Sequence, residues 1–333
     1  MKRSSVGGQA VLEGVMMKTP LGGTALAVRR SDGSIVKEFY HGSTLAKKGT
    51  FFGWPIVRGV VSFIESLVGG MKITTRSAEI YGDEEVEEPT KFEKWLSEKL
   101  GKSVMDVALV IAVILAIALS FGLFYFLPTL VTQLIPWGEN VPTIFKSLVE
   151  GVVRLLIFLA YLFAIGFMKD IGRLYMYHGA EHKVISCYEN EGELEPENIK
   201  KYSRLHARCG TNYLFLVMAV SIVIYAILPY SNKFWLRLLT RLIFLPLVAG
   251  VSYEVLRAAA SSDGKLACAV RAPGLALQHL TTREPETEMI EVALAAFNLA
   301  LDPPDEDIVI DLEKEKQEKA AAAKEETKEK VEA

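Results

Sequence analysis

The sequence predicts an α-helical polytopic membrane protein with about four transmembrane helices. Half of its 333 residues are hydrophobic, and the mean hydropathy is positive, at +0.25. The apolar residues are gathered in the middle of the chain in long runs with few charges, whereas a soluble domain spreads them at the period of a helix or a strand. We expect a small α+β region before these helices and a helical region after them.

Composition narrows the classes of function. The formal net charge is only −3, with 37 Lys and Arg against 40 Asp and Glu, so no nucleic-acid partner is expected. The three cysteines, Cys187, Cys209 and Cys268, are too few and too scattered for a disulfide framework. No continuous apolar run follows the first residues, so no cleavable signal peptide is expected. The expected partner is the lipid bilayer.

Four stretches have the length and apolar character of a membrane-crossing helix, which needs ~20 residues. The second carries Lys146, Glu150 and Arg154, which are spaced four apart and therefore lie on one helical face, where they can pair. The fourth carries Arg237 and Arg241 in its first two turns. The candidate stretches are 107–127, 143–168, 211–230 and 234–255.

The distribution of lysine and arginine predicts the orientation. Residues 128–142, between the first two stretches, contain neither, whereas residues 169–209, between the second and third, contain seven. Basic residues also precede the first stretch and follow the fourth. Because basic loops stay inside, we expect a multi-pass protein of the plasma (inner) membrane with both termini in the cytoplasm.

Residues 1–100 are expected to form a cytoplasmic α+β region. Two β-type runs, 24–30 and 34–40, flank Ser31-Asp32-Gly33, a sequence typical of a hairpin turn. Residues 55–71 form a largely apolar helix with a proline at its start. We expect this helix to lie on the membrane surface, because a further crossing would reverse the orientation of every later loop.

The rest of the chain divides by composition. An acidic linker at 83–88 leads to the transmembrane region, 104–256. The cytoplasmic C-terminal region, 257–301, contains a helix at 285–301 with apolar residues at helical spacing. Residues 302–333 are highly charged and lack an apolar stripe, so we expect a disordered tail or a solvated helix.

The segment most informative about chemistry is His178-Gly-Ala-Glu181-His182. The two histidines are one helical turn apart, so both can bind one metal ion, and the order H-x-x-E-H is that of the inverted zinc peptidases, in which the glutamate is the general base. His206 and Cys209 follow at a spacing of three, again on one face. These four side chains match a tetrahedral zinc site, and zinc is the expected cofactor.

Two more residues are possible additional ligands, and explanations without a metal ion compete with the predicted metal site. Glu254 and His279 are expected on the same side of the membrane as the other candidates. However, a five-residue motif with three fixed positions also occurs by chance, a charged loop beside a membrane can face lipid headgroups, and Cys209 can be a small packed residue. Four protein ligands would make a closed structural site, whereas three would leave a position for catalysis.

Gly7 to Gly14 is glycine-rich but lacks the Lys-Ser/Thr of a phosphate-binding loop, so we expect tight turns there and no cofactor-binding segment. Several segments nevertheless resemble signature sequences of the YqhQ-like bacterial membrane proteins, which are described as uncharacterised and sometimes as predicted metal-dependent enzymes. Ala207 departs from the pattern, since the family more often has proline there. The segments are GGQAVLEGVMM (7–17), GWPIVRG (53–59), YHGAEHK (177–183), HARCGT (206–211) and QHLTTREP (278–285).

Three hypotheses of function follow. The first is a zinc-dependent hydrolase at the cytoplasmic membrane face, with Glu181 as general base and a membrane-proximal peptide or lipid-linked substrate. The second is a non-enzymatic scaffold, assembly factor or regulator in which a metal or polar cluster holds the cytoplasmic segments together. The third is a transporter, for which Lys146, Glu150 and Arg154 are the candidate path residues.

Overall fold

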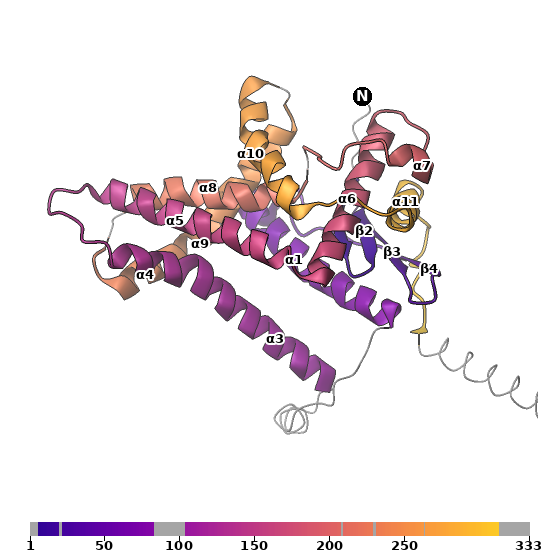
Figure 1. The fold of residues 1–333 in the computed structure, drawn as a ribbon, viewed down its shortest axis with the longest axis horizontal. Coiled ribbons are helices and arrows are strands. Elements are labelled where there is room, and N and C mark those ends of the chain that lie inside the picture. Colours follow the sequence, from indigo (N-terminus) through magenta and orange to yellow (C-terminus); the bar gives the residue numbers. More distant parts are fainter. Residues whose placement is uncertain are drawn as a thin grey trace, which may run out of the picture.

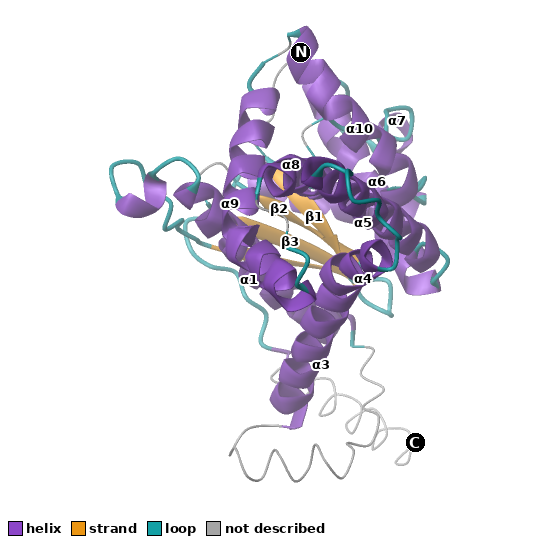
Figure 2. Cartoon of the chain, turned by 90° about the vertical axis from the view of Figure 1, so that its left-hand side faces the viewer, coloured by secondary structure: helices purple, strands orange, loops and turns teal. Residues whose placement is uncertain are grey.

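The computed structural model describes residues 6–19, 22–82, 104–207, 209–228, 231–262 and 264–312. Long apolar helices form a bundle at one end of the molecule, and a small sheet with its covering helices forms the other end (Figure 1). Seen along the bundle, the strands lie behind the helices (Figure 2). The predicted acidic linker, 83–88, and residues 313–333 of the predicted tail lie outside the described residues.

The sheet has four antiparallel strands in the order β1-β2-β3-β4. The predicted hairpin is confirmed as β3 and β4, with Gly33 in the left-handed region (φ 86°) at its turn. The expectation of tight turns from Gly7 to Gly14 is confirmed only at Leu12-Glu13, because the residues before it form β1, which pairs with β2 across this two-residue turn. The strands are β1 Gly7–Val11, β2 Gly14–Lys18, β3 Thr24–Arg29 and β4 Ile35–Tyr40.

Both faces of the sheet are covered. One face packs on α6 (Lys169–Glu189) and α11 (Thr287–Leu301) through a core that includes Met17, Phe39 and Phe297. The other packs on the second half of α1 (Val57–Tyr81), mainly through Ile80. This double burial explains why β2 and β3 are almost wholly apolar. Because one cover is α6, the sheet fixes the helix that carries the H-x-x-E-H sequence.

Helix α1 joins the sheet to the bundle. It begins at Val57, close to the predicted position, but continues ten residues beyond the predicted end at 71. Its first half packs on α9 (Phe234–Ala260), where Gly59 lies against Gly250, and its second half packs on the sheet. It is not among the helices apolar enough to cross a membrane. Its first half exposes large apolar side chains: Phe63, Ile64, Leu67, Val68 and Met71.

Three described helices are long and apolar enough to cross a membrane: Val110–Gln133, Thr143–Ile165 and Phe234–Ala260. This indicates membrane association, but four spans are not confirmed. The predicted third span is the helix α8 (Thr211–Ile227), whose 17 residues reach ~26 Å, slightly less than the ~30 Å of a bilayer core. It packs between α5 and α9.

The first apolar helix does not end at Pro128 as predicted. It runs as α3 (Val104–Phe121), a π-helical turn (Gly122–Phe126) and α4 (Leu127–Gln133). Pro128 has no N–H to donate to the carbonyl of Phe124, four residues earlier. The Arg154 Nε of α5 (Thr143–Ile165) donates to that carbonyl at 2.8 Å and satisfies it. Towards its N-terminus, away from this contact, α3 diverges from the other helices (Figure 1).

The segment 169–209, predicted as a loop, is largely helical. Helix α6 follows α5 after three residues and is stabilised by its burial against the sheet and α11. Residues 302–312, predicted to belong to the tail, are instead attached to β4, where Ile308 exchanges backbone hydrogen bonds with Phe39. The predicted helix at 285–301 corresponds to α11. The remaining helices are α7 Pro196–Ile199 and α10 Lys265–Thr281.

Candidate metal centre

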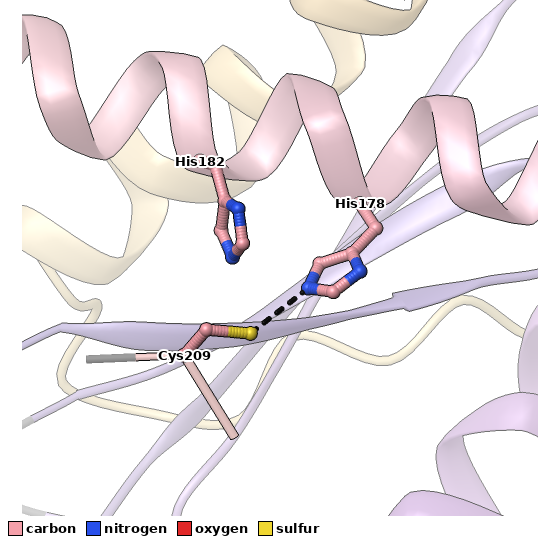
Figure 3. A group of neighbouring side chains, drawn as sticks. All are labelled: His178, His182 and Cys209. Atoms are coloured by element: carbon pink, nitrogen blue, oxygen red, sulfur yellow. Dashed lines mark hydrogen bonds between the residues drawn. The ribbon is translucent and has the colours of Figure 1, made fainter. Parts of the chain in front are cut away.

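His178 and His182 lie on successive turns of α6 and face the same side. Their ring centroids are 4.4 Å apart. Cys209, two residues before α8, lies opposite them, so that all three side chains converge (Figure 3). Their candidate ligand atoms lie within 4.8 Å of one another. The structure therefore brings together three of the four side chains that the sequence predicts as metal ligands.

Backbone carbonyls hold both imidazole rings. His178 Nδ1 lies 2.9 Å from the carbonyl oxygen of Thr281, and His182 Nδ1 lies 2.6 Å from that of Arg204. A carbonyl oxygen only accepts, so each Nδ1 carries the proton and each Nε2 keeps a lone pair. His178 Nε2 points to Cys209 Sγ at 3.1 Å. His182 Nε2 is buried and has no hydrogen-bond partner within the described part of the chain.

Cys209 is buried, and its sulfur faces the two rings. Burial raises the pKa of its thiol to about 12, with the nearby Glu181 carboxyl as a further cause, although the N–H and hydroxyl of Thr211 act in the opposite direction. Both Thr211 groups lie within hydrogen-bond distance of Sγ, at 3.4 Å for the amide and 3.0 Å for the hydroxyl. A bound cation would reverse this preference and favour the thiolate.

The segment that carries Cys209 is fixed by α10. The fully buried Gln278 amide donates to the carbonyl of His206 and accepts the His206 N–H, each at 2.8 Å. Gln278 also donates to Asn212, whose amide donates in turn to the carbonyl of Ala207 at 2.8 Å. These bonds connect α10, α8 and the intervening segment, so the sulfur is held at a defined distance from α6.

Glu181 lies on the same helix, one residue before His182, and is only 4% exposed. Its Oε1 accepts the N–H of Gly8 in β1 at 3.0 Å, while Oε2 is buried without a hydrogen-bond partner among the residues described. Burial raises the pKa of this carboxyl, against the opposing effects of His178 and the Gly8 amide. A raised pKa makes the carboxylate a stronger base than an exposed one.

The other predicted ligands lie elsewhere. His206 is near His182, at 5.7 Å between ring centroids, but its Nε2 contacts Glu189 at 3.2 Å. Burial lowers the pKa of His206 to about 4, so at neutral pH this contact joins a neutral imidazole to a carboxylate. Glu254 pairs with Arg58 and accepts the N–H of Ile56.

His279 is exposed on α10. It lies outside the group of three converging ligands.

The sequence reasoning missed the residues that position the ligands. They are Gly8, Gln278 and the carbonyl groups of Arg204 and Thr281. A Cβ on Gly8 would lie 2.9 Å from the Glu181 side chain and 2.7 Å from a backbone oxygen of β2, so only glycine fits there. Gly8, Gln278 and Thr281 lie in segments that resemble the family signature sequences, and this resemblance was the feature of the sequence that could have identified them.

The arrangement suits a divalent metal ion. Histidine ligands of zinc commonly donate the second ring N–H to a carbonyl or carboxylate, as both histidines do here. Two imidazole nitrogens and one sulfur are ligands that zinc prefers, and three protein ligands leave a fourth position open. A tetrahedral ion would place these ligand atoms ~3.3–3.8 Å apart, which requires small movements from the observed separations.

Fold and site together define a class: a mostly helical protein with apolar helices that indicate membrane association, a small antiparallel sheet, and a His/His/Cys cluster beside the start of α8. The chain belongs to the family described as "Protein of unknown function (DUF1385)", whose model matches residues 54–303. The predicted YqhQ-like resemblance is thereby confirmed.

A curated relative supports the same assignment. The chain is 35% identical over 305 residues to "Uncharacterized protein YqhQ" of Bacillus subtilis (strain 168), with 88% of this chain and 91% of the relative covered. No solved structure matches the chain. The descriptions of the family and of the relative name no activity, so the geometry of the site is what bears on function.

Proposed function

We propose that this protein is a zinc-dependent hydrolase of the plasma membrane that works at the cytoplasmic face. The observation that carries the proposal is the convergence of two histidine Nε2 atoms and the Cys209 sulfur, with each Nδ1 held by a backbone carbonyl. A purely structural packing of these side chains does not require both lone pairs to face one point. A metal ion does.

The proposed membrane arrangement has four crossing helices and both termini in the cytoplasm. The crossing helices are the α3–α4 unit, α5, α8 and α9, with α8 counted because it lies between two longer apolar helices. The absence of Lys and Arg from residues 128–142 of the sequence, against seven in 169–209, supports the orientation. The metal centre then lies halfway along α6, where this helix meets the segment that leads into α8, on the cytoplasmic side of the bundle.

In this proposal His178, His182 and Cys209 hold the ion, and His206 supports the ring of His182 without being a ligand. When bound, zinc would polarise a carbonyl or phosphoryl oxygen and make water more acidic. Glu181 would accept the proton at Oε2, since Oε1 is held by the Gly8 amide. Its raised pKa, caused by burial, suits a base that works near neutral pH.

The proposed substrate is a membrane-proximal peptide or a lipid-linked molecule, because the site lies beside the start of the apolar helix α8. The test combines metal analysis with an activity screen on the purified full-length protein. Wild type and Glu181→Gln should both contain zinc, but only wild type should cleave members of a library of membrane-associated peptides and lipid-linked esters. Zinc-free wild-type protein, or equal cleavage by both proteins, would contradict the proposal.

A second candidate is a non-enzymatic scaffold with a structural zinc ion. It is favoured by the fact that the cluster connects α6, the segment before α8 and, through the Thr281 carbonyl, α10. In that case His178→Ala should lower the melting temperature, whereas Glu181→Gln should change neither the melting temperature nor cell growth. The contrast between these two variants separates the scaffold from the enzyme.

A further inference from the structure

A second polar cluster lies inside the bundle, far along the chain from the metal centre. Glu150 and Arg154 of α5 meet Arg237 and Arg241 of α9, and each of the four is at most 2% exposed. Lys146, predicted to pair on the same face of α5, lies instead over the ring of Trp137. This cluster has no role in the proposed hydrolysis.

The cluster carries an excess of positive charge. All three guanidinium groups lie within 3.6 Å of the Glu150 carboxylate, which is the only acidic partner of Arg154 and Arg241 among the described residues. Among the described residues, Arg154 and Arg241 against this one carboxylate already leave a formal charge of +1, without counting Arg237. Arginine does not lose its proton in proteins, and an unbalanced charge is costly inside a membrane. The excess therefore calls for an anion.

Aromatic rings lie over the guanidinium groups of Arg154 and Arg241, so that only the N–H edges of these groups are available for polar contacts. Arg154 lies between the rings of Tyr125 and Tyr225, each 5.2 Å away, and Arg241 lies over Tyr225 at 4.5 Å. Aromatic rings cover the faces of the planar guanidinium groups and leave the N–H edges for hydrogen bonds. Edge-on N–H groups from several arginines match the oxygens of a phosphate.

The cluster reaches the surface at Gln133. This residue, the last of α4, is exposed, and its Oε1 accepts a hydrogen bond from Arg237 Nη2 at 2.9 Å. A neutral amide at the surface can rotate away and give its place to a stronger acceptor. Gln133 thus covers an approach to Arg237.

The depth of Arg237 favours a lipid as the source of the anion. Arg237, the fourth residue of α9, lies ~5 Å from the start of that helix, whereas Arg154, the twelfth residue of α5, lies ~17 Å from the outer end of its helix, near the middle. Trp137 and Trp235 lie at the same end as Arg237, where tryptophan marks the membrane interface. Lipid phosphates lie at this interface, at the depth of Arg237.

We propose that Arg237 and Arg241, backed by Arg154, bind a phosphate-bearing anion at the outer end of the bundle, with Gln133 as the side chain that the anion displaces. The inference rests on the membrane arrangement proposed above but not on the zinc site. A phosphodiester or phosphate supplies one or two negative charges and so offsets the excess.

The test is thermal unfolding of the full-length protein in nanodiscs. Phosphatidylcholine alone is the reference, and either phosphatidylglycerol in the discs or inorganic phosphate in the buffer supplies the anion. A bound anion should raise the melting temperature of the wild type. Arg237→Gln should lose that increase, whereas Lys146→Gln, which removes a half-buried cation outside the cluster from the same helix as Glu150, should keep it.

An increase with phosphatidylglycerol alone identifies a lipid phosphate, and an increase with inorganic phosphate identifies a soluble anion. No increase with either, or the same increase in Arg237→Gln, would overturn the site. If Arg237→Gln does not fold, Gln133→Ala replaces it: removing the cover should enlarge the increase, and an unchanged increase would overturn the proposal. Zinc content measured in the same samples should be the same with and without the anion and in each variant. Failure of the anion site can therefore be distinguished from failure of the metal site.

Discussion

The two buried polar clusters of this protein are built from opposite chemistry. In the metal-ligand cluster, carbonyl oxygens hold the N–H groups of His178 and His182, so that lone pairs face the centre. In the bundle, the carboxylate of Glu150 faces N–H groups of three arginines. The first arrangement presents electron pairs and suits a cation. The second presents protons and suits an anion.

This contrast shows that the partners of a side chain, as well as its identity, decide what a site can bind. If the proton of either ring were on Nε2 instead of Nδ1, that histidine would present an N–H to the centre and repel a metal ion. Arginines spread over the surface would be screened by water and would need no added anion. The predictions below test whether each cluster depends on its own ligand and is independent of the other.

The largest effect is expected from Glu150→Gln. Removing one partner of a buried ion pair leaves uncompensated charge and costs about 3–5 kcal/mol. In phosphatidylcholine nanodiscs the melting temperature should fall sharply, while the zinc content of the folded protein should stay the same. Loss of zinc together with stability would show that the clusters are coupled, which would break the comparison.

Removing a metal ligand should act on the other cluster alone. We expect His182→Ala to lower zinc affinity by more than ~100-fold, since even residues that only orient the ligands contribute ~10–100-fold. Competition with a fluorescent zinc chelator measures this affinity. His279→Ala is the matched control, because His279 is an exposed histidine outside the cluster. An equal loss in both variants would point to non-specific binding by histidine.

Gly8→Ala tests the position of Glu181. The added methyl group would lie 2.9 Å from the Glu181 side chain, and such overpacking costs about 1–3 kcal/mol. We expect a lower melting temperature and lost cleavage with zinc retained. Gly7→Ala should have neither effect, because a Cβ there meets nothing within 4 Å. Similar melting curves for both variants would contradict the described contact.

A change of one pH unit should have the smallest effect, about tenfold in zinc affinity. Burial raises the pKa of Cys209 to about 12, whereas it lowers the pKa of His182 well below its ordinary value. The thiol must therefore release a proton on binding, but the histidine is already neutral. Affinity should rise about tenfold per pH unit between pH 6 and 8. Cys209→Ser should bind zinc weakly, and a flat wild-type profile would argue against a thiolate ligand.

Local patterns predicted much of this molecule. The hairpin at residues 24–40 and the terminal helix α11 follow from turn chemistry and from the spacing of apolar residues. The convergence of His178 and His182 follows from helical geometry. Each of these features depends on residues that are close in sequence.

The failures depend on contacts between distant residues. The helix continues past Pro128 because Arg154, from another helix, satisfies the carbonyl of Phe124. Residues 169–189 are helical because the sheet buries them. His206 lies on the expected side but is held by Glu189, and nothing in the spacing of four candidate ligands reveals which three will meet.

The most direct test of the central claim is the zinc X-ray absorption spectrum of the purified full-length protein. The account predicts about one zinc ion per chain, with nitrogen ligands at ~2.0–2.1 Å and one sulfur at ~2.3 Å. The sulfur shell should disappear in Cys209→Ser. The proposed metal centre would be contradicted if the purified wild-type protein contained no zinc, or if its spectrum showed no sulfur ligand.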